Sequence, residues 1–402
     1  MNLHKRNGFL VAFAATGAVI LCACSHLPSD ADKADGNVPH PATRSIQAVG
    51  QRYAPDSRMA IFEVGIERRG RELVLTGEVD RAEARIEAVR AVQRTGAKVV
   101  DAIRVLPEEQ LGDQVWGIGC LSVCNGRLGP EHKNEMGTQV LMGEIIRVWK
   151  RSTNAAFPWY LTQAADGYLS WQQKDTFVRC TREQAEAWRG APLLIVTAME
   201  DCIREQPQAS AQPVSDVVLC DRVRKTGEEG GWYKVELPDG RAGFLPKKAA
   251  EDFAAWEQAR QPTAENIERT ARQFIGRPYL WGGNSPKGLD CSGFSSLVFY
   301  LNGIELQRDS GQQAKQGVAV PLDPALSQLR KGDLLFFGHA AVDDKPERVI
   351  HVGLYLGDKL FIHSSGRVHI SSLDLQSPLC DELRIRTLLR ARRILTDQMN
   401  RR

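Results

Sequence analysis

Four consecutive residues in the last third of the chain have the types and order that a thiol hydrolase needs. Cys291 stands in the run Asp290-Cys291-Ser292-Gly293, directly before a long apolar stretch. Asp and Ser are favoured at helix N-termini, so the sequence predicts that Cys291 lies at the start of a helix. Exposed amides and the helix dipole at such a position favour a thiolate. Cys291 is therefore a candidate nucleophile; a buried structural cysteine is the alternative.

Two histidines further along the chain could serve as partners of this cysteine. His351 lies in the apolar run 349–356, and His363 lies in a second apolar run after the turn Gly357-Asp358. A two-residue hairpin between these runs would make the histidines cross-strand neighbours. His351 could then act as a base and His363 as the group that orients it. A zinc site is the alternative, but the three residues lack the paired spacing of zinc ligands.

Regular elements with clear local signals surround these residues. The pattern predicts a helix over 265–274, a turn-rich segment over 276–283 and a helix after Asp290. A turn and a strand are predicted over 331–337, and one strand in each of the two runs that carry the histidines. The candidate nucleophile would thus begin a helix, and its candidate partners would lie on strands.

Five motifs follow one another in this part of the chain: Arg277-Pro278-Tyr279, Trp281-Gly282-Gly283, Asp290-Cys291-Ser292-Gly293, Gly332-Asp333-Leu334-Leu335-Phe336 and His351-Val352-Gly353. With these motifs, residues 265–395 resemble the NlpC-type cysteine peptidases of the bacterial cell wall, which have a papain-like fold. The resemblance implies that Cys291 is the nucleophile, His351 the general base and His363 the orienting residue, with Tyr279 at the substrate. It also implies cleavage of peptidoglycan stem peptides between γ-D-glutamate and a diamino acid, without a cofactor or metal.

Two stretches before this domain, 109–190 and 191–250, are rich in short alternating strands. Each contains a Trp-Tyr pair followed by Asp-Gly and an aromatic strand, beginning at Trp159 in the first and Trp232 in the second. The stretches resemble bacterial SH3-like barrels with five strands, and another small β-barrel is the alternative. Residues 251–264 are expected to link them to the peptidase domain.

This domain order resembles the dipeptidyl-peptidase VI subgroup, which requires a free N-terminal L-alanine on its substrate. The subgroup carries an Arg-Asp-Ser motif, which matches Arg308-Asp309-Ser310 here. Its first SH3-like module supplies an acidic residue and a tyrosine, which match Glu135 and Tyr168. The resemblance therefore implies an amine pocket made of Asp309, Ser310, Glu135 and Tyr168. An extra stretch between 337 and 349 departs from the subgroup pattern.

The first part of the chain reads as an envelope leader followed by a small domain. Residues 1–23 resemble a lipoprotein signal peptide, with Cys24 as the lipidation site and Ser25 as an outer-membrane sorting residue. An ordinary signal peptide with Cys24 as a bystander is the alternative. Residues 24–57 are predicted to be a flexible tether. Residues 58–108 show a strand–strand–helix–strand pattern that resembles a BON-type domain, or else form a plain α/β spacer.

Composition and cysteine count narrow the function classes. The 402 residues suffice for several domains, and 52 basic against 49 acidic residues give a net charge of +3, too balanced to indicate nucleic-acid binding. Together with the leader and the family resemblances, the expectation is a monomeric α+β multidomain lipoprotein of the outer membrane that faces the periplasm. In that oxidising compartment six further cysteines suggest disulfides, with Cys202–Cys220 as the first pair. They are Cys120, Cys124, Cys180, Cys202, Cys220 and Cys380.

Two other functions remain open from the sequence. The protein could be a wall-binding scaffold whose catalytic domain is inactive, or an amidase or acyltransferase on a related papain-like fold. The complete Cys–His–His set favours hydrolysis.

Overall fold

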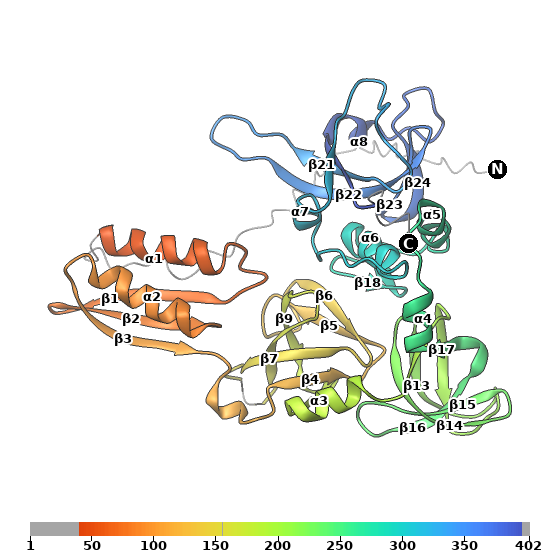
Figure 1. Ribbon diagram of the computed structural model, residues 1–402, viewed down its shortest axis with the longest axis horizontal. Coiled ribbons are helices and arrows are strands. Elements are labelled where there is room, and N and C mark those ends of the chain that lie inside the picture. The colour runs from red at the N-terminus through yellow and green to blue at the C-terminus, as the bar shows by residue number, and fades with distance from the viewer. Residues whose placement is uncertain (1–39, 155, 396–402) are drawn as a thin grey trace, which may run out of the picture.

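The computed structural model describes residues 40–154 and 156–395, which form a mixed α and β protein with several sheets (Figure 1). The signal peptide, Cys24 and residues 24–39 of the predicted tether lie outside the described residues. Four units follow one another along the chain. We refer to them as the N-terminal unit (40–106), the first β-unit (109–190), the second β-unit (191–252) and the C-terminal unit (264–395).

The N-terminal unit contains the strand–strand–helix–strand order that the sequence predicts. Strand β2 lies in the middle of its three-stranded sheet, antiparallel to β1 and parallel to β3. Helix α2 covers one face of this sheet, as Figure 1 shows. The elements are β1 (Phe62–Arg69), β2 (Glu72–Val79), α2 (Ala82–Gln93) and β3 (Lys98–Val105).

A second helix, α1 (His40–Tyr53), lies beside α2 and corrects the tether prediction for these residues. Ala42, Ile46 and Val49 are buried in the same hydrophobic cluster as the sheet. Their spacing places them on one face of a helix, and burial of this narrow stripe stabilises the helix although most of its residues are polar. The tether prediction relied on the low average hydrophobicity of the segment and therefore missed this stripe.

Each β-unit has a seven-stranded sheet, whereas the sequence predicted five strands. The additional strands are short and lack clear alternation, so sequence patterns do not separate them from loops. The first β-unit has the order β10-β4-β7-β8-β9-β5-β6 and ends with helix α3 (Arg182–Arg189). Its strands are β4 (Trp116–Gly119), β5 (Val123–Arg127), β6 (Met136–Leu141), β7 (Ile145–Arg151), β8 (Trp159–Gln163), β9 (Leu169–Gln173) and β10 (Phe177–Cys180).

The second β-unit has the order β13-β12-β16-β15-β14-β11-β17. The predicted linker contains helix α4 (Phe253–Ala259), which Asp252 caps by accepting a hydrogen bond from the Ala255 amide at 2.9 Å. The strands are β11 (Leu193–Val196), β12 (Glu200–Arg204), β13 (Pro213–Val218), β14 (Arg222–Glu229), β15 (Trp232–Glu236), β16 (Ala242–Pro246) and β17 (Ala250–Asp252).

The C-terminal unit packs helices α5 and α6 against a six-stranded antiparallel sheet of order β20-β25-β21-β22-β23-β24 (Figure 1). The extra stretch between residues 337 and 349 extends the hairpin formed by β21 and β22. The elements are α5 (Ala264–Arg272), β18 (Asn284–Ser285), β19 (Gly288–Leu289), α6 (Cys291–Tyr300), α7 (Ser310–Gln313), β20 (Val318–Val320), β21 (Leu334–His339), β22 (Arg348–Gly357), β23 (Leu360–Ser365), β24 (Arg367–Ser372), α8 (Glu382–Thr387) and β25 (Leu388–Arg393).

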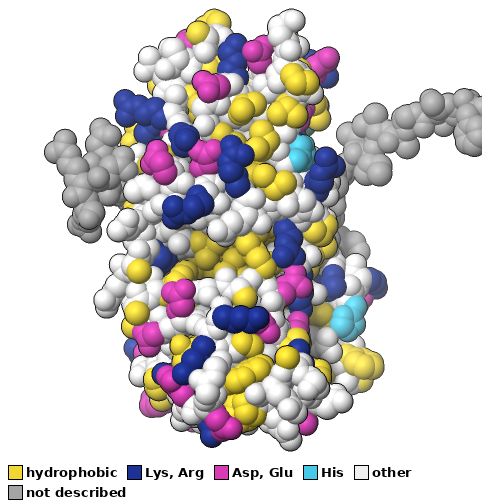
Figure 2. Space-filling model, turned by 90° about the vertical axis from the view of Figure 1, so that its right-hand side faces the viewer, with side chains coloured by type: hydrophobic (Ala, Val, Ile, Leu, Met, Phe, Trp, Pro, Cys, Tyr) yellow, Lys and Arg dark blue, Asp and Glu magenta, His cyan; other side chains and the backbone are white. Residues whose placement is uncertain are grey.

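Both β-units contribute side chains to the core of the C-terminal unit. Leu141 of the first β-unit and Val218, Leu219 and Cys220 of the second belong to the cluster that contains Phe294 of α6. On the face shown in Figure 2, hydrophobic side chains gather between the upper and lower halves of the molecule. The three units are therefore joined by apolar packing.

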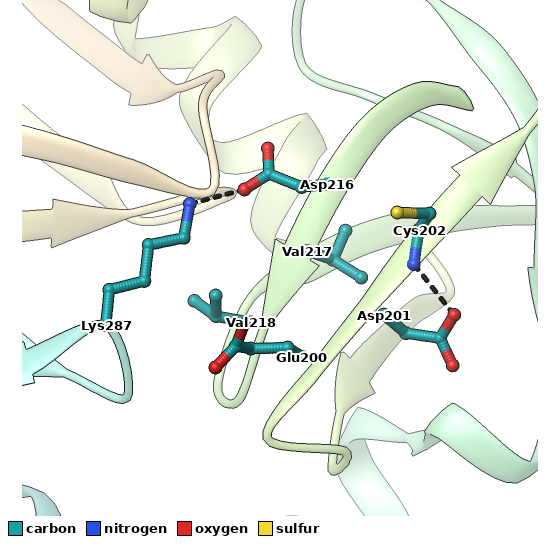
Figure 3. A pocket seen from close by; sticks show the side chains of 7 residues that line it. All are labelled: Glu200, Asp201, Cys202, Asp216, Val217, Val218 and Lys287. Carbon is teal, nitrogen blue, oxygen red and sulfur yellow. Dashed lines mark hydrogen bonds and ion pairs between the residues drawn. The ribbon is translucent and has the colours of Figure 1, made fainter. Parts of the chain in front are cut away.

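A polar junction also ties these three units together. Lys287, in the turn between β18 and β19, reaches Asp216 of β13, and it also donates a hydrogen bond to Ser122 Oγ at 2.9 Å. Ser122 in turn donates to Asp216 at 2.7 Å. Figure 3 shows Lys287 pointing to Asp216 at the edge of a cavity of about 210 Å³ that Cys202 also lines.

The predicted disulfide between Cys202 and Cys220 is wrong, and all seven cysteines of the described residues are free thiols. Cys202 on β12 lies opposite Asp216 on β13, whereas Cys220 is four residues further along (220 against 216). The Cys220 amide donates a hydrogen bond to the Val196 carbonyl, and its side chain is buried in the shared core. The two cysteines thus occupy different surroundings.

Among the described helices, none has the length and apolarity to cross a bilayer.

Candidate active site

The N-terminus of α6 places Cys291 at the first helical position, as the sequence predicts. Asp290 caps the helix by accepting a hydrogen bond from the Gly293 amide at 2.6 Å. A Cβ on Gly293 would lie 2.1 Å from the Gly283 carbonyl oxygen, so this turn of the helix requires glycine. Close packing against residues 283–284 thus fixes the position of Cys291.

Arg308 holds the capping carboxylate from the other side. Its guanidinium makes two hydrogen bonds to Asp290, the shorter at 2.7 Å, and one to Ser292 Oγ at 3.2 Å. It also donates to Thr138 Oγ1 of the first β-unit at 3.2 Å. The Arg308 side chain is only 2% exposed. Sequence reasoning treated Arg308 as part of a motif and missed that it connects the cysteine helix to the first β-unit.

The two predicted histidines meet directly. His351 Nε2 and His363 Nδ1 are 2.8 Å apart, and His363 Nε2 lies 3.1 Å from Ser371 Oγ of β24. Leu354 lies opposite Ile362, so continuing this register puts His363 diagonal to His351 rather than directly opposite. Ser371 is a partner that the sequence did not indicate.

Cys291 lies beside the strand that carries His351. The Cys291 sulfur accepts a hydrogen bond from the backbone amide of Val352 in that strand. Burial, and then the nearby charge of Asp290, raise the pKa of the Cys291 thiol to about 12, although the Val352 amide lowers it. The predicted lowering of this pKa by the helix terminus is therefore wrong for this protein. The cost of desolvating a thiolate exceeds the effect of the helix dipole.

The same burial keeps the histidines neutral. Desolvation lowers the pKa of His351 well below its usual value, and the positive charge of Arg384 lowers it further. Burial also lowers the pKa of His363 to about 3. The resting site therefore holds a protonated thiol and two neutral imidazoles.

Arg384 of α8 is a charged neighbour of this site that sequence reasoning missed. Its guanidinium lies 5.7 Å from the centre of the Phe337 ring and interacts electrostatically with Cys291 and Tyr279. The side chain is 12% exposed, and its buried Nε makes no hydrogen bond but lies 4.0 Å from Asp381 Oδ2 in an ion pair. Arg384 stands 93 residues beyond Cys291 (384 against 291), so no local signal marks it.

The structure brings together part of the predicted amine pocket. Tyr168 is buried, and its hydroxyl donates a hydrogen bond to Asp309 Oδ2 at 3.3 Å across the two units. Ser310 is buried next to Asp309 at the start of α7, and Tyr279 is half-buried near Arg384. Glu135 is exposed, and its carboxylate makes no hydrogen bond or ion pair within residues 40–154 and 156–395. Among the described residues, Glu135 is thus not joined to the other three by a side-chain hydrogen bond or ion pair.

An arginine from the N-terminal unit also enters this pocket. Arg58 Nη1 contacts Asp309 Oδ2, the oxygen that Tyr168 also reaches. Asp56 holds the same guanidinium through two bonds of 2.8 Å. Sequence reasoning placed Arg58 at the edge of a separate domain and missed this contact.

No group of three His, Cys, Asp or Glu suited to a metal ion occurs among the residues that the structure describes.

Comparison with known proteins links the C-terminal unit to one family. Residues 276–384 match the NlpC/P60 family. The chain is 31% identical over 238 residues to a γ-D-glutamyl-L-lysine dipeptidyl-peptidase of Bacillus cereus, covering 58% of this chain and 68% of that protein. It is 30% identical over 263 residues to dipeptidyl-peptidase 6 of Lysinibacillus sphaericus, covering 62% of this chain and 89% of that protein.

Similarity in structure extends beyond this unit. The crystal structure of an NlpC/P60 family protein from Bacillus cereus superposes with a TM-score of 0.58 at 24% identity. The match covers 70% of this chain and the whole of that chain. At this identity the match concerns the fold alone.

Proposed function

Because the chain belongs to the NlpC/P60 family of cysteine peptidases, we propose that it cleaves the γ-D-glutamyl bond to a diamino acid in peptidoglycan stem peptides. The observation that supports this most is the contact of His351 with His363 beside Cys291, inside the segment that matches the family. The name of the Bacillus cereus relative indicates the γ-D-glutamyl bond, and the names of both relatives indicate a dipeptidyl-peptidase.

The proposed mechanism starts from the neutral site. Since His351 Nε2 faces His363, its Nδ1 is the nitrogen available to Cys291. His351 then carries its proton on Nε2 and donates to His363 Nδ1, and His363 donates from Nε2 to Ser371. This chain of donors fixes the tautomer in which His351 Nδ1 can accept the thiol proton.

Proton transfer accompanies attack in this mechanism. The thiol proton moves to His351 Nδ1 as the sulfur bonds to the γ-carbonyl carbon of D-glutamate. The imidazolium then protonates the leaving amine of the diamino acid, and the carbon–nitrogen bond breaks. Water, deprotonated by His351, hydrolyses the thioester and restores the thiol. In this mechanism, amides at the α6 N-terminus stabilise the oxyanion.

We further propose that a free N-terminal L-alanine is recognised between the first β-unit and the C-terminal unit. An ammonium removed from water must be paired with a carboxylate, and Asp309 is held here by Tyr168. Ser310 and Tyr279 would line the same pocket. Glu135 would have to turn inward from its exposed position to join them.

The test is hydrolysis of a defined peptide, L-Ala-γ-D-Glu-L-Lys, followed by mass spectrometry of the products. The wild-type protein should release L-Ala-γ-D-Glu, and Cys291→Ala should abolish turnover with an unchanged circular dichroism spectrum. Turnover by well-folded Cys291→Ala protein would refute the nucleophile. An intact substrate with the wild-type protein would instead favour a scaffold, and products cut at another bond would indicate an amidase or acyltransferase.

The remaining units suggest where the peptidase acts. We propose that the two β-units are SH3-like wall-associated modules, that the N-terminal unit is BON-like, and that lipid on Cys24 anchors a monomer in the outer membrane, facing the periplasm. Cys24→Ser should release the protein from the membrane fraction. A mature N-terminus at another residue, without lipid, would contradict the anchor.

A further inference from the structure

A short segment of the N-terminal unit forms a strap across the proposed amine pocket. We define the strap as residues 56–59, between α1 and β1, which turns from the three-stranded sheet towards the first β-unit (Figure 1). The Arg58 carbonyl accepts a hydrogen bond from the Leu169 amide at 2.7 Å. The Met59 carbonyl accepts one from Gln163 Nε2 at 2.8 Å. Backbone groups therefore hold the strap in place, whatever side chain position 58 carries.

The strap also contacts the C-terminal unit through side chains. Gln312 of α7 donates a hydrogen bond to Asp56 Oδ2 at 2.8 Å, three residues from Asp309. Asp56 fixes the Arg58 guanidinium, which reaches Asp309 Oδ2 with its third nitrogen. Asp309 thus already has an internal cation as partner before any substrate binds.

The geometry points to Arg58 as a specificity-determining residue that competes with the N-terminal ammonium of the substrate for Asp309. This inference rests on the proposed amine recognition. Two cations cannot share one carboxylate without repulsion, so a bound ammonium must displace the guanidinium or tolerate it at short range. The Arg58 side chain is 42% exposed and retains Asp56 as a partner, which makes displacement feasible. The wild-type preference for a free amine over a blocked amine should therefore be weaker than in a pocket where Arg58 does not compete for Asp309.

The test measures that preference as a ratio. We compare kcat/KM for L-Ala-γ-D-Glu-L-Lys with kcat/KM for its N-acetylated form, in the wild type and in Arg58→Ala. Removing the competing cation should raise the ratio by about tenfold, mainly through a lower KM for the free-amine peptide. Arg58→Lys keeps a cation on the strap and should keep the ratio near the wild-type value. Arg69→Ala removes an exposed arginine of the same unit and should leave the ratio unchanged.

A binding measurement separates this inference from the proposed reaction. In the Cys291→Ala background, calorimetry with the dipeptide L-Ala-γ-D-Glu should give a Kd about tenfold lower when Arg58→Ala is added. If the wild type fails to hydrolyse the tripeptide but this Kd falls, the proposed function is wrong and the competition stands. An unchanged or higher Kd, or a ratio that Arg58→Ala leaves unchanged or lowers, overturns the competition and makes Arg58 a support of the pocket.

Discussion

At the scale of single residues, burial sets the protonation of the proposed catalytic groups. The Cys291 thiol has a raised pKa and His351 a lowered one, so both are neutral before substrate arrives. A neutral pair is consistent with proton transfer during attack rather than a preformed thiolate. Arg384 is the charged neighbour that lowers the pKa of His351 most, and its effect on that pKa can be measured.

Replacing Arg384 by glutamine should shift the acidic limb of the kcat/KM profile to higher pH. The positive charge of Arg384 lowers the pKa of His351, so its removal raises that pKa. His351 must be unprotonated to act as base, and with a higher pKa it becomes protonated, and inactive, at a higher pH. Arg386→Gln on the same helix, where Arg386 is exposed and pairs with Glu382, is the control and should not move the limb. An acidic limb that stays in place in Arg384→Gln would contradict this role.

The residues that could be predicted from sequence are those with local signals. Cys291 follows a helix cap, and His351 and His363 lie in two apolar strands joined by a short turn. Arg58 and Asp309 meet across 251 residues of sequence, and a single sequence contains no signal for such a contact. The thiol pKa was predicted in the wrong direction because it depends on burial, which the helix position alone does not reveal.

At the scale of elements, α6 depends on a buried ion pair at its N-terminus. Its apolar run and its cap were predictable, but the pairing of Asp290 with Arg308 was not, since it arises from the approach of the segment before α7. Helix α1 was missed for the related reason that only three buried residues mark its face. Elements with strong local periodicity were thus predicted, and those stabilised by distant partners were not.

The variant Arg308→Met should lower the free energy of unfolding by about 3–5 kcal/mol, because it leaves the buried Asp290 carboxylate without its counter-charge. Adding Asp290→Asn removes that charge while keeping a side chain that can cap α6, and should restore a large part of the loss. Urea titration of the two single variants and the double variant provides the measurement. A double variant whose loss equals the sum of the single losses would show that the pair is not coupled.

At the scale of the whole molecule, the two β-units and the C-terminal unit share one core and one polar junction. Leu141 and Cys220 pack into the cluster around α6, and Lys287 binds Ser122 and Asp216 of the two β-units. The wall of the proposed amine pocket depends on the same arrangement, because Tyr168 and Asp309 come from different units. The proposed recognition of a free amine and the stability of the protein therefore depend on the same packing between units.

This shared packing predicts that Leu141→Ala, a change in the first β-unit, loosens α6, the helix that carries the proposed nucleophile Cys291. Leu141 is 5% exposed and belongs to the cluster that contains Cys291 and Phe294. The cavity left by truncating its side chain should lower the free energy of unfolding by about 2–5 kcal/mol and weaken packing within the C-terminal unit. Leu245→Ala is the matched control, since Leu245 of β16 is fully buried in a different hydrophobic cluster, built mainly by the second β-unit. Hydrogen exchange of the α6 amides should accelerate in Leu141→Ala well beyond the change in Leu245→Ala at equal loss of stability. Equal exchange in both variants would mean that the units unfold as one block, so that only global stability, and no local contact, links Leu141 to the active site.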